Sequence, residues 1–264
     1  MQNSTKAKLG SGEAVLGTFV FLNDPAVVEI AAIAGLDFVI VDAEHSAHDA
    51  ASTEAMIRAA DARGITPLVR VSELNEKEIL RALESGAHGI VIPQIESGEQ
   101  AARAVAAMRY PPYGTRSSCR QTRASEYGRW AADFATHADE ADRELLIVAL
   151  IETEAGLENL SEILDAGIEV AFLGRSDLSS SMGLRGDLTH PRIEPVAKQF
   201  VADVGAHPAQ CWPGIVPYRV DDEWETLGCP FIVQGADVNV MLAGLREAAA
   251  QLRGARAGAA ASGG

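Results

Sequence analysis

The sequence predicts an α/β protein, a single-domain (β/α)₈ TIM barrel, on three observations. Short apolar and β-branched runs recur along the chain with helix-like segments between them, which is the pattern of repeated βα units around a parallel sheet. Eight such runs fall within the 264 residues, and one barrel usually needs ~250 residues. That length also suffices to bury a large core. We expect the barrel over residues 1–254, and an open, doubly wound sheet is the alternative.

The predicted elements alternate along the whole barrel. The helical segments carry apolar residues at helical spacing, and several have a polar first residue and a glycine near the end. Examples are 50–64, 75–86, 97–110, 156–167 and 237–254. The predicted strands, in order, are Ala14–Leu22, Leu36–Val41, Thr66–Val71, Gly89–Ile92, Leu145–Ile151, Glu169–Gly174, Cys211–Val216 and Pro230–Gln234.

Two segments fall outside this alternation. The stretch Pro111–Glu144 is rich in Arg, Ser and Tyr and is too long for an ordinary connection, so we expect an active-site or interface loop. Residues 255–264 are of low complexity and predict a disordered C-terminal tail.

The charge of the chain limits its partners. The formal net charge is −15 and the isoelectric point is near 4.8, so nucleic acid and anionic membranes would be repelled. We expect small molecules, cations or other subunits instead. No apolar run approaches the ~20 residues that cross a bilayer, and the first residues hold no hydrophobic signal region, so we expect a cytoplasmic protein. Cys119, Cys211 and Cys229 are odd in number and widely spaced, which indicates reduced, structural cysteines.

Polar residues gather where the predicted strands end. The chemistry of a TIM barrel lies at the C-terminal ends of its strands, so these residues are expected to share one rim. They are Asp42, Glu44 and His45 after the second strand, Arg70 in the third, Pro93 and Gln94 after the fourth, Glu152 after the fifth, and Gly174, Arg175, Ser176 and Asp177 at the sixth.

Glu152 and Asp177 are the candidate metal ligands. Two carboxylates that converge on one rim repel each other unless a cation lies between them, and oxygen ligands suit Mg²⁺ or Mn²⁺. The simpler alternative is that Asp177 caps a helix and Glu152 meets an arginine.

His45 and Arg70 are candidates for proton transfer and for anion binding. His45 could act as a base whose tautomer is fixed by Asp42 or Glu44, or it could be a satisfied histidine without a role. Arg70 interrupts an apolar strand, and a buried guanidinium needs an anion, either a substrate carboxylate or one of those two acids. His48 is expected to open the next helix.

Some reaction types are excluded. The four lysines, Lys6, Lys8, Lys77 and Lys198, fall at no predicted strand end, which argues against a Schiff base. The chain contains no GxxxxGK[ST] phosphate loop and no dinucleotide fingerprint.

Six motifs occur in order: VDAEHSAHD, LVRV, GIVIPQIES, RYPPYGTRS, IETEAGLENL and FLGRSDLSSSMG. With them the sequence resembles the HpcH/HpaI-type metal-dependent class II pyruvate aldolases, a family that includes 4-hydroxy-2-oxoheptanedioate aldolase and 2-dehydro-3-deoxyglucarate aldolase. The resemblance covers roughly Leu16 to Leu252.

The resemblance implies reversible aldol cleavage of a 4-hydroxy-2-oxo acid to pyruvate and an aldehyde. Glu152 and Asp177 would ligate a divalent ion, Mg²⁺, Mn²⁺ or Co²⁺, that chelates pyruvate. Arg70 would bind the keto oxygen, and His45 paired with Asp42 would act as the acid/base. The resemblance further implies that the backbone around Gly174, Arg175 and Ser176 holds the pyruvate carboxylate, that Glu84 reaches a neighbouring subunit's site, and that the protein is a homo-oligomer, a trimer or a hexamer.

The chain departs from the family pattern at several places. Leu150 replaces a frequent glutamine, Arg175 stands where proline is usual, EHSAHD replaces EHAPND, and the loop from Pro111 to Tyr127 is divergent. Two rivals therefore remain. One is a Claisen-type lyase of CoA esters, because ALIETEAGL is also similar to the citrate lyase β-subunit and malyl-CoA lyase group. The other is a catalytically silent metabolite-binding barrel.

Overall fold

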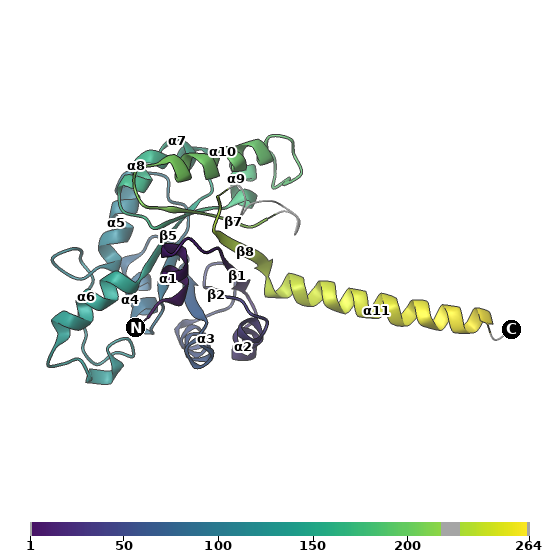
Figure 1. Ribbon diagram of the computed structural model, residues 1–264, viewed down its shortest axis with the longest axis horizontal. Helices are drawn as coiled ribbons and strands as arrows, with labels where there is room; N and C mark the ends of the chain where they lie inside the picture. Colours follow the sequence, from purple (N-terminus) through teal and green to yellow (C-terminus); the bar gives the residue numbers. More distant parts are fainter. Residues whose placement is uncertain (1, 218–227, 263–264) are drawn as a thin grey trace.

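Eight parallel strands close into a barrel in the order of the chain, which confirms the predicted fold (Figure 1). The structure is a computed structural model that describes residues 2–217 and 228–262, with the side chains of the last helix described as far as Arg253. The strands match the predicted ones to within a few residues. They are β1 Val15–Val20, β2 Phe38–Asp42, β3 Thr66–Arg70, β4 Gly89–Ile92, β5 Leu146–Ile151, β6 Val170–Leu173, β7 Trp212–Ile215 and β8 Phe231–Ala236.

Helices surround the barrel, and side chains cap several of them. The helix α3, Ala50–Arg63, starts with a capping box between Asp49 and Ser52, and it ends before Gly64, whose φ of 72° suits a residue without Cβ. The predicted helix 156–167 consists of two short helices that meet at Asn159. The described helices are α1 Ser4–Gly10, α2 Pro25–Ile33, α3 Ala50–Arg63, α4 Glu76–Glu84, α5 Gly98–Met108, the 3₁₀ turn η1 Glu126–Gly128, α6 Phe134–Glu144, α7 Glu154–Glu158, α8 Leu160–Asp165, α9 Arg175–Ser181, α10 Ile193–Ala206 and α11 Asp237–Ser262.

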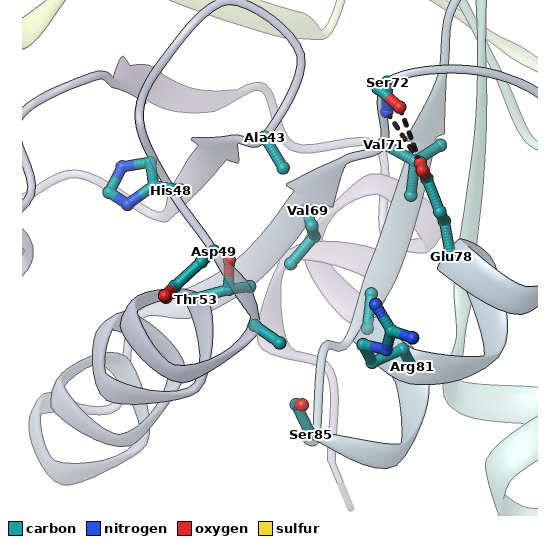
Figure 2. A pocket seen from close by; sticks show the side chains of 12 residues that line it. Ala43, His48, Asp49, Thr53, Val69, Val71, Ser72, Glu78, Arg81 and Ser85 are labelled. Atoms are coloured by element: carbon teal, nitrogen blue, oxygen red, sulfur yellow. Dashed lines mark hydrogen bonds between the residues drawn. The ribbon is translucent and has the colours of Figure 1, made fainter.

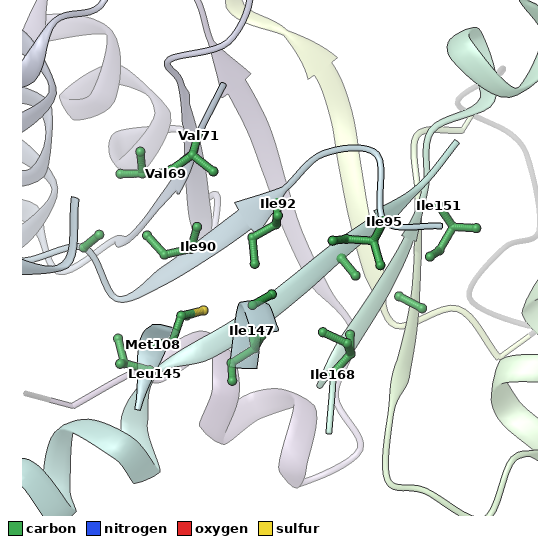
Figure 3. Close-up of a cluster of buried hydrophobic side chains, with 14 of the residues drawn as sticks. Val69, Val71, Ile90, Ile92, Ile95, Met108, Leu145, Ile147, Ile151 and Ile168 are labelled. Carbon is green, nitrogen blue, oxygen red and sulfur yellow. The ribbon is translucent and has the colours of Figure 1, made fainter. Parts of the chain in front are cut away.

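The core has two layers because alternate residues of each strand face opposite sides. Along β2, Phe38 and Ile40 belong to the cluster inside the barrel, whereas Val39 and Val41 pack outside it, under the helices. Figure 3 shows part of the outer layer, where strand side chains such as Ile92 and Ile147 lie close to Ile95 and Met108. At the C-terminal end of each strand, the inward-facing residues come after the last residue of the cluster inside the barrel. They therefore face the open mouth of the barrel.

The other end of the barrel is closed by α1. The Asn3 side-chain amide donates to the carbonyl oxygens of His88 and Glu144, at 3.0 Å each, and Lys6 Nζ donates to the carbonyl oxygen of Leu145 at 2.7 Å. These residues precede β4 and β5, so α1 lies across the N-terminal ends of the strands. Substrate access is thereby limited to the opposite, C-terminal end.

The segment Pro111–Glu144 lies at the closed end, so its predicted role as an active-site loop of its own subunit is wrong. Arg123 Nη1 donates to the carbonyl oxygen of Ser85 at 2.9 Å, and the N–H of Ala124 donates to the carbonyl oxygen of Glu84 at 3.1 Å. The physical reason is topological: a connection from a helix to the next parallel strand must lie at the N-terminal end of that strand. The segment also contains α6, and its use as an interface stays a prediction.

The last helix, α11, extends away from the barrel (Figure 1, yellow). It includes residues 255–262 of the segment that the sequence predicts to be disordered, and the predicted domain limit at residue 254 stays a prediction. Among the described residues, no helix is both long enough and apolar enough to span a bilayer.

Candidate active site

The strand ends place four predicted site residues on inward-facing positions of the barrel mouth. Asp42 and Arg70 are register partners in β2 and β3, two residues beyond the inner-core residues Ile40 and Leu68. In β5 and β6, Leu150 pairs with Phe172, so Glu152 and Gly174 come two residues later on the same side. The rim expected from the sequence is therefore formed.

Arg70 is held by two carboxylates and an aromatic ring. Its Nε donates to Asp42 Oδ1 at 3.1 Å, and its Nη2 donates to Asp42 Oδ2 in a short bond. Glu44 Oε2 lies 3.2 Å from Nη1, and the guanidinium carbon lies 4.8 Å from the centre of the Phe19 ring. Asp42 is fully buried. Because a bidentate pair fixes both the position and the plane of a guanidinium, Arg70 is oriented before any substrate binds.

The ring of His45 lies next to Glu44, one of the two partners expected from the sequence, and not next to Asp42, the partner that the family resemblance implied. His45 Nε2 is 3.7 Å from Glu44 Oε2, and the His45 side chain is more than half exposed. Asp42 Oδ1 accepts the backbone N–H groups of Glu44 and His45, at 2.9 and 3.0 Å, so it fixes the loop rather than the ring. Burial raises the pKa of Glu44, against the lowering effects of Arg70 and His45.

Glu152 lies at the base of the mouth with its carboxylate fixed from two sides. The backbone N–H of Gln94 donates to Glu152 Oε1 at 2.8 Å, and Gln94 has a left-handed φ of 54°, which is unusual for a residue with a side chain. Gly174 lies on the other side, close to Glu152 Oε2. Burial raises the pKa of Glu152 to about 7; the Gln94 hydrogen bond opposes this rise, and the nearby charges of Asp177 and Glu44 add to it.

The three residues after Gly174 begin α9. Asp177 is exposed in its first turn, and the N-cap is Gly174, which has no capping side chain. The alternative that Asp177 is the N-cap is therefore wrong. Ser176 is exposed, whereas Arg175 is buried, and Arg175 Nη2 donates to the carbonyl oxygen of Val216 just after β7.

The charges of the site fit a divalent cation. Four carboxylates surround the mouth, Asp42, Glu44, Glu152 and Asp177, and Arg70 pairs with the first two. Within the described residues, Glu152 and Asp177 form no ion pair, and no cluster of three or more His, Cys, Asp or Glu could hold a metal. Two carboxylates leave coordination positions for water and substrate, as Mg²⁺ prefers. Burial is the main cause of the raised pKa of Glu152, and the nearby charges of Asp177 and Glu44 add to it; a bound cation would offset both effects.

Two predicted residues lie away from this mouth. Glu84 ends α4, beside the N-terminal ends of the strands, so it cannot serve the site of its own subunit. His48 lines a cavity of about 260 Å³ between α3 and α4, together with residues such as Thr53, Glu78 and Arg81 (Figure 2). Sequence reasoning missed Phe19, whose inward position in β1 was the available signal. It also missed the hydrogen bond from the backbone N–H of Gln94 to Glu152, which no sequence pattern predicts.

Comparisons with known proteins agree with this geometry. The family model described as HpcH/HpaI aldolase/citrate lyase matches residues 16–255. The hydroxypyruvate/pyruvate aldolase of Pseudomonas aeruginosa is 31% identical over 254 residues, 96% of this chain and 93% of that protein. The 5-keto-4-deoxy-D-glucarate aldolase of Salmonella arizonae is 31% identical over 253 residues, 94% of this chain and 95% of that protein.

Solved structures show the same similarity. A crystal structure of an HpcH/HpaI aldolase/citrate lyase family protein from Burkholderia cenocepacia superposes with a TM-score of 0.88 at 27% identity. The match covers 96% of this chain and 100% of that one.

Proposed function

Because the chain belongs to the HpcH/HpaI aldolase/citrate lyase family, we propose that it is a class II aldolase that cleaves a 4-hydroxy-2-oxo acid reversibly into pyruvate and an aldehyde. The relatives with the highest similarity reported above are named aldolases, and they match nearly the whole chain. A cytoplasmic location stays a prediction from the sequence.

One observation supports this proposal most strongly. Among the described residues, the buried Glu152 and the exposed Asp177 form no ion pair, and both lie at the barrel mouth where Arg70 presents a fixed guanidinium. A 2-oxo acid offers two oxygens to a cation and a carbonyl oxygen to a cationic donor, so its chemistry complements this arrangement. Glu152 and Asp177 would hold the divalent ion, which would act as a Lewis acid on the 2-oxo group.

The protein side chains supply the remaining functions. Asp42 takes two of the five N–H donors of Arg70, so donors remain for the keto oxygen, where negative charge develops as the C3–C4 bond breaks. His45, exposed at the mouth, would carry the proton that moves during cleavage. The first-turn N–H groups of α9, at Arg175 and Ser176, would face the substrate carboxylate.

The proposal is tested with the metal-free chain, to which Mg²⁺, Mn²⁺ or Co²⁺ is added in turn. Pyruvate or hydroxypyruvate is combined with a panel of aldehydes, and the aldol product and the exchange of the pyruvate methyl protons are measured. We expect both reactions to require the metal and to disappear in Glu152→Ala. Full activity of the metal-free chain would falsify the metal-dependent mechanism.

Adding malyl-CoA and a Mn²⁺ binding measurement to this panel separates the rivals. A Claisen-type lyase would cleave malyl-CoA but form no aldol product, and a catalytically silent barrel would neither bind Mn²⁺ nor exchange pyruvate protons. The names of the relatives favour the aldolase.

We also propose that the protein is a homo-oligomer whose contacts include α11. Val240, Met241 and Leu245 are largely exposed on this projecting helix, and the adjacent outer face of the barrel exposes Ile30 and Ile33 of α2. An apolar cavity of about 420 Å³ lies where α2 meets the start of α11. A second copy of the chain could bury these surfaces by packing its own α11 there, which would remove apolar area from water.

A further inference from the structure

Glu44 lies between Arg70 and His45, the two side chains that the proposed function assigns to enolate binding and to proton transfer. Its Oε2 atom lies 3.2 Å from Arg70 Nη1 and 3.7 Å from His45 Nε2. One carboxylate oxygen therefore faces both the guanidinium and the imidazole. The side chain of Glu44 is largely buried, at 12% exposure, so solvent screens these contacts less than it would at the surface.

The other candidate partners of His45 and Arg70 are already occupied. Asp42 uses both carboxylate oxygens on Arg70, and Oδ1 also accepts two backbone N–H groups. Asp42 thus fixes one edge of the guanidinium and the start of the loop. It leaves the Nη1 side of Arg70 and the ring of His45 to another group, and among the described residues the carboxylate in contact with both is Glu44.

Glu44 itself is fixed by the local backbone. Its N–H donates to Asp42 Oδ1 at 2.9 Å, and the next residue does the same, so the turn after β2 is bound to the buried end of that strand.

We propose that Glu44 is a positioning residue that holds Arg70 and His45 at a fixed separation, so that the guanidinium meets the enolate oxygen while the imidazole meets the proton. The inference rests on the proposed function and deepens it, because it names the group that couples the two roles. Glu44 touches neither the substrate nor the reacting atoms, and its effect is transmitted through the two side chains that do.

The proposal predicts a specific kinetic pattern for Glu44→Gln. The amide keeps the shape of the side chain but removes the charge that attracts both partners. Arg70 stays bound to Asp42, so we expect the KM for the 2-oxo acid to stay within about threefold of the original value while kcat falls about 10–100-fold, since misplacement of catalytic groups acts mainly on the transition state. Glu44→Asp keeps the negative charge, but its side chain is one methylene shorter, so the carboxylate lies farther from Arg70 and His45. Its kcat should lie between those of Glu44→Gln and the unmodified chain.

A binding measurement separates positioning from a merely structural role. Oxalate is a planar dianion that resembles the enolate of pyruvate, and its dissociation constant can be measured calorimetrically at saturating Mn²⁺. We expect Glu44→Gln to weaken oxalate binding by a factor similar to its loss of kcat, with an unchanged melting temperature. If Glu44 only supported the fold, the melting temperature would fall and each folded molecule would bind oxalate normally.

The matched control is Glu78→Gln. Glu78 accepts hydrogen bonds from the backbone N–H and the hydroxyl of Ser72 in the wall of the cavity between α3 and α4 (Figure 2), and among the described residues it forms no hydrogen bond or ion pair with Arg70 or His45. This variant should leave both kcat and oxalate binding unchanged. Normal oxalate affinity in Glu44→Gln overturns the positioning role while the aldolase proposal stands. By contrast, an unmodified chain that neither binds oxalate with Mn²⁺ nor performs the aldol reaction overturns the proposed function itself.

Discussion

Gly174 lies so close to Glu152 that a Cβ atom added to the glycine would come within 2.7 Å of Glu152 Oε2 and 2.8 Å of Glu152 Cβ. The two residues belong to neighbouring strand ends, β5 and β6, and both face the barrel mouth. The space above Gly174 is therefore occupied by the carboxylate itself. The absence of a side chain at position 174 is what allows the Glu152 carboxylate to lie there.

Gly174→Ala should therefore displace Glu152 and weaken metal binding. We expect the Mn²⁺ dissociation constant to rise at least about tenfold and kcat/KM to fall about 100-fold, because small displacements of catalytic groups are costly. Isothermal titration with Mn²⁺ gives the first value and steady-state kinetics the second. Gly205→Ala is the control, since a Cβ there meets nothing within 4 Å in α10. Equal Mn²⁺ affinity in the two variants would show that Gly174 does not position Glu152.

The metal-free protein should lose stability as the pH rises through the range in which Glu152 ionises. Burial raises the pKa of Glu152 from 4.5 to about 7, so the folded state holds its proton more tightly than the unfolded state. The resulting stabilisation is complete below pH 4.5 and is lost between pH 4.5 and about 7, with a total of at most about 3 kcal/mol. Glu152→Gln should not show this loss.

The test is urea denaturation of both metal-free proteins across that pH range. If the free energy of unfolding depended on pH in the same way in both proteins, the assignment to Glu152 would be contradicted. The pKa of Glu44 is raised as well, so only the difference between the two proteins isolates Glu152.

Arg70→Lys should impair the enzyme although it conserves the charge. A lysine cannot reproduce the two hydrogen bonds that Arg70 makes to the fully buried Asp42, nor the contact with Glu44. We expect kcat/KM to fall about 100–1000-fold and the melting temperature to drop, because Asp42 is left partly unpaired in the core. Arg103→Lys, which alters an exposed pair with Glu76, provides the comparison and should change neither quantity.

Borohydride added with pyruvate should trap no covalent adduct. Lys6 is bonded to Glu169 at the closed end of the barrel, Lys8 pairs with Asp37, and Lys198 pairs with Glu194 on α10. Lys77 is exposed in the first turn of α4. Mass spectrometry of the intact chain measures the outcome, and a mass increase that depends on pyruvate would mean that the reaction uses a lysine.

Replacing Leu245 by Asp should shift the protein toward smaller assemblies. The substitution puts a charge on the apolar face of α11, where contact with a second copy is proposed, and a buried, unpaired charge is costly. Light scattering after size-exclusion chromatography measures the mass. Arg246→Asp changes the charge at the neighbouring position and serves as the control if it leaves the mass unaltered. The oligomer proposal fails if the unmodified chain is monomeric at micromolar concentrations.

The sequence by itself determined the eight strands and the rim that their C-terminal ends share, because the alternation of apolar runs and amphipathic helices leaves few other ways to bury that much apolar surface. It also predicted that Asp42, Arg70 and Glu152 would share this rim, since each stands at or next to the C-terminal end of a predicted strand. Local pattern and global fold agree at these positions.

Only the tertiary structure decided which groups pair there. Asp42 binds Arg70 and not the ring of His45, and Glu44 takes the place beside the imidazole, because the turn after β2 directs the two carboxylates to different partners. The closeness of Gly174 to Glu152 depends on the register of β5 and β6, which lie in separate parts of the sequence. Such side-chain contacts depend on distances between different strands across the barrel. The spacing of residues along the sequence indicates only which residues lie on the same face of one strand or helix.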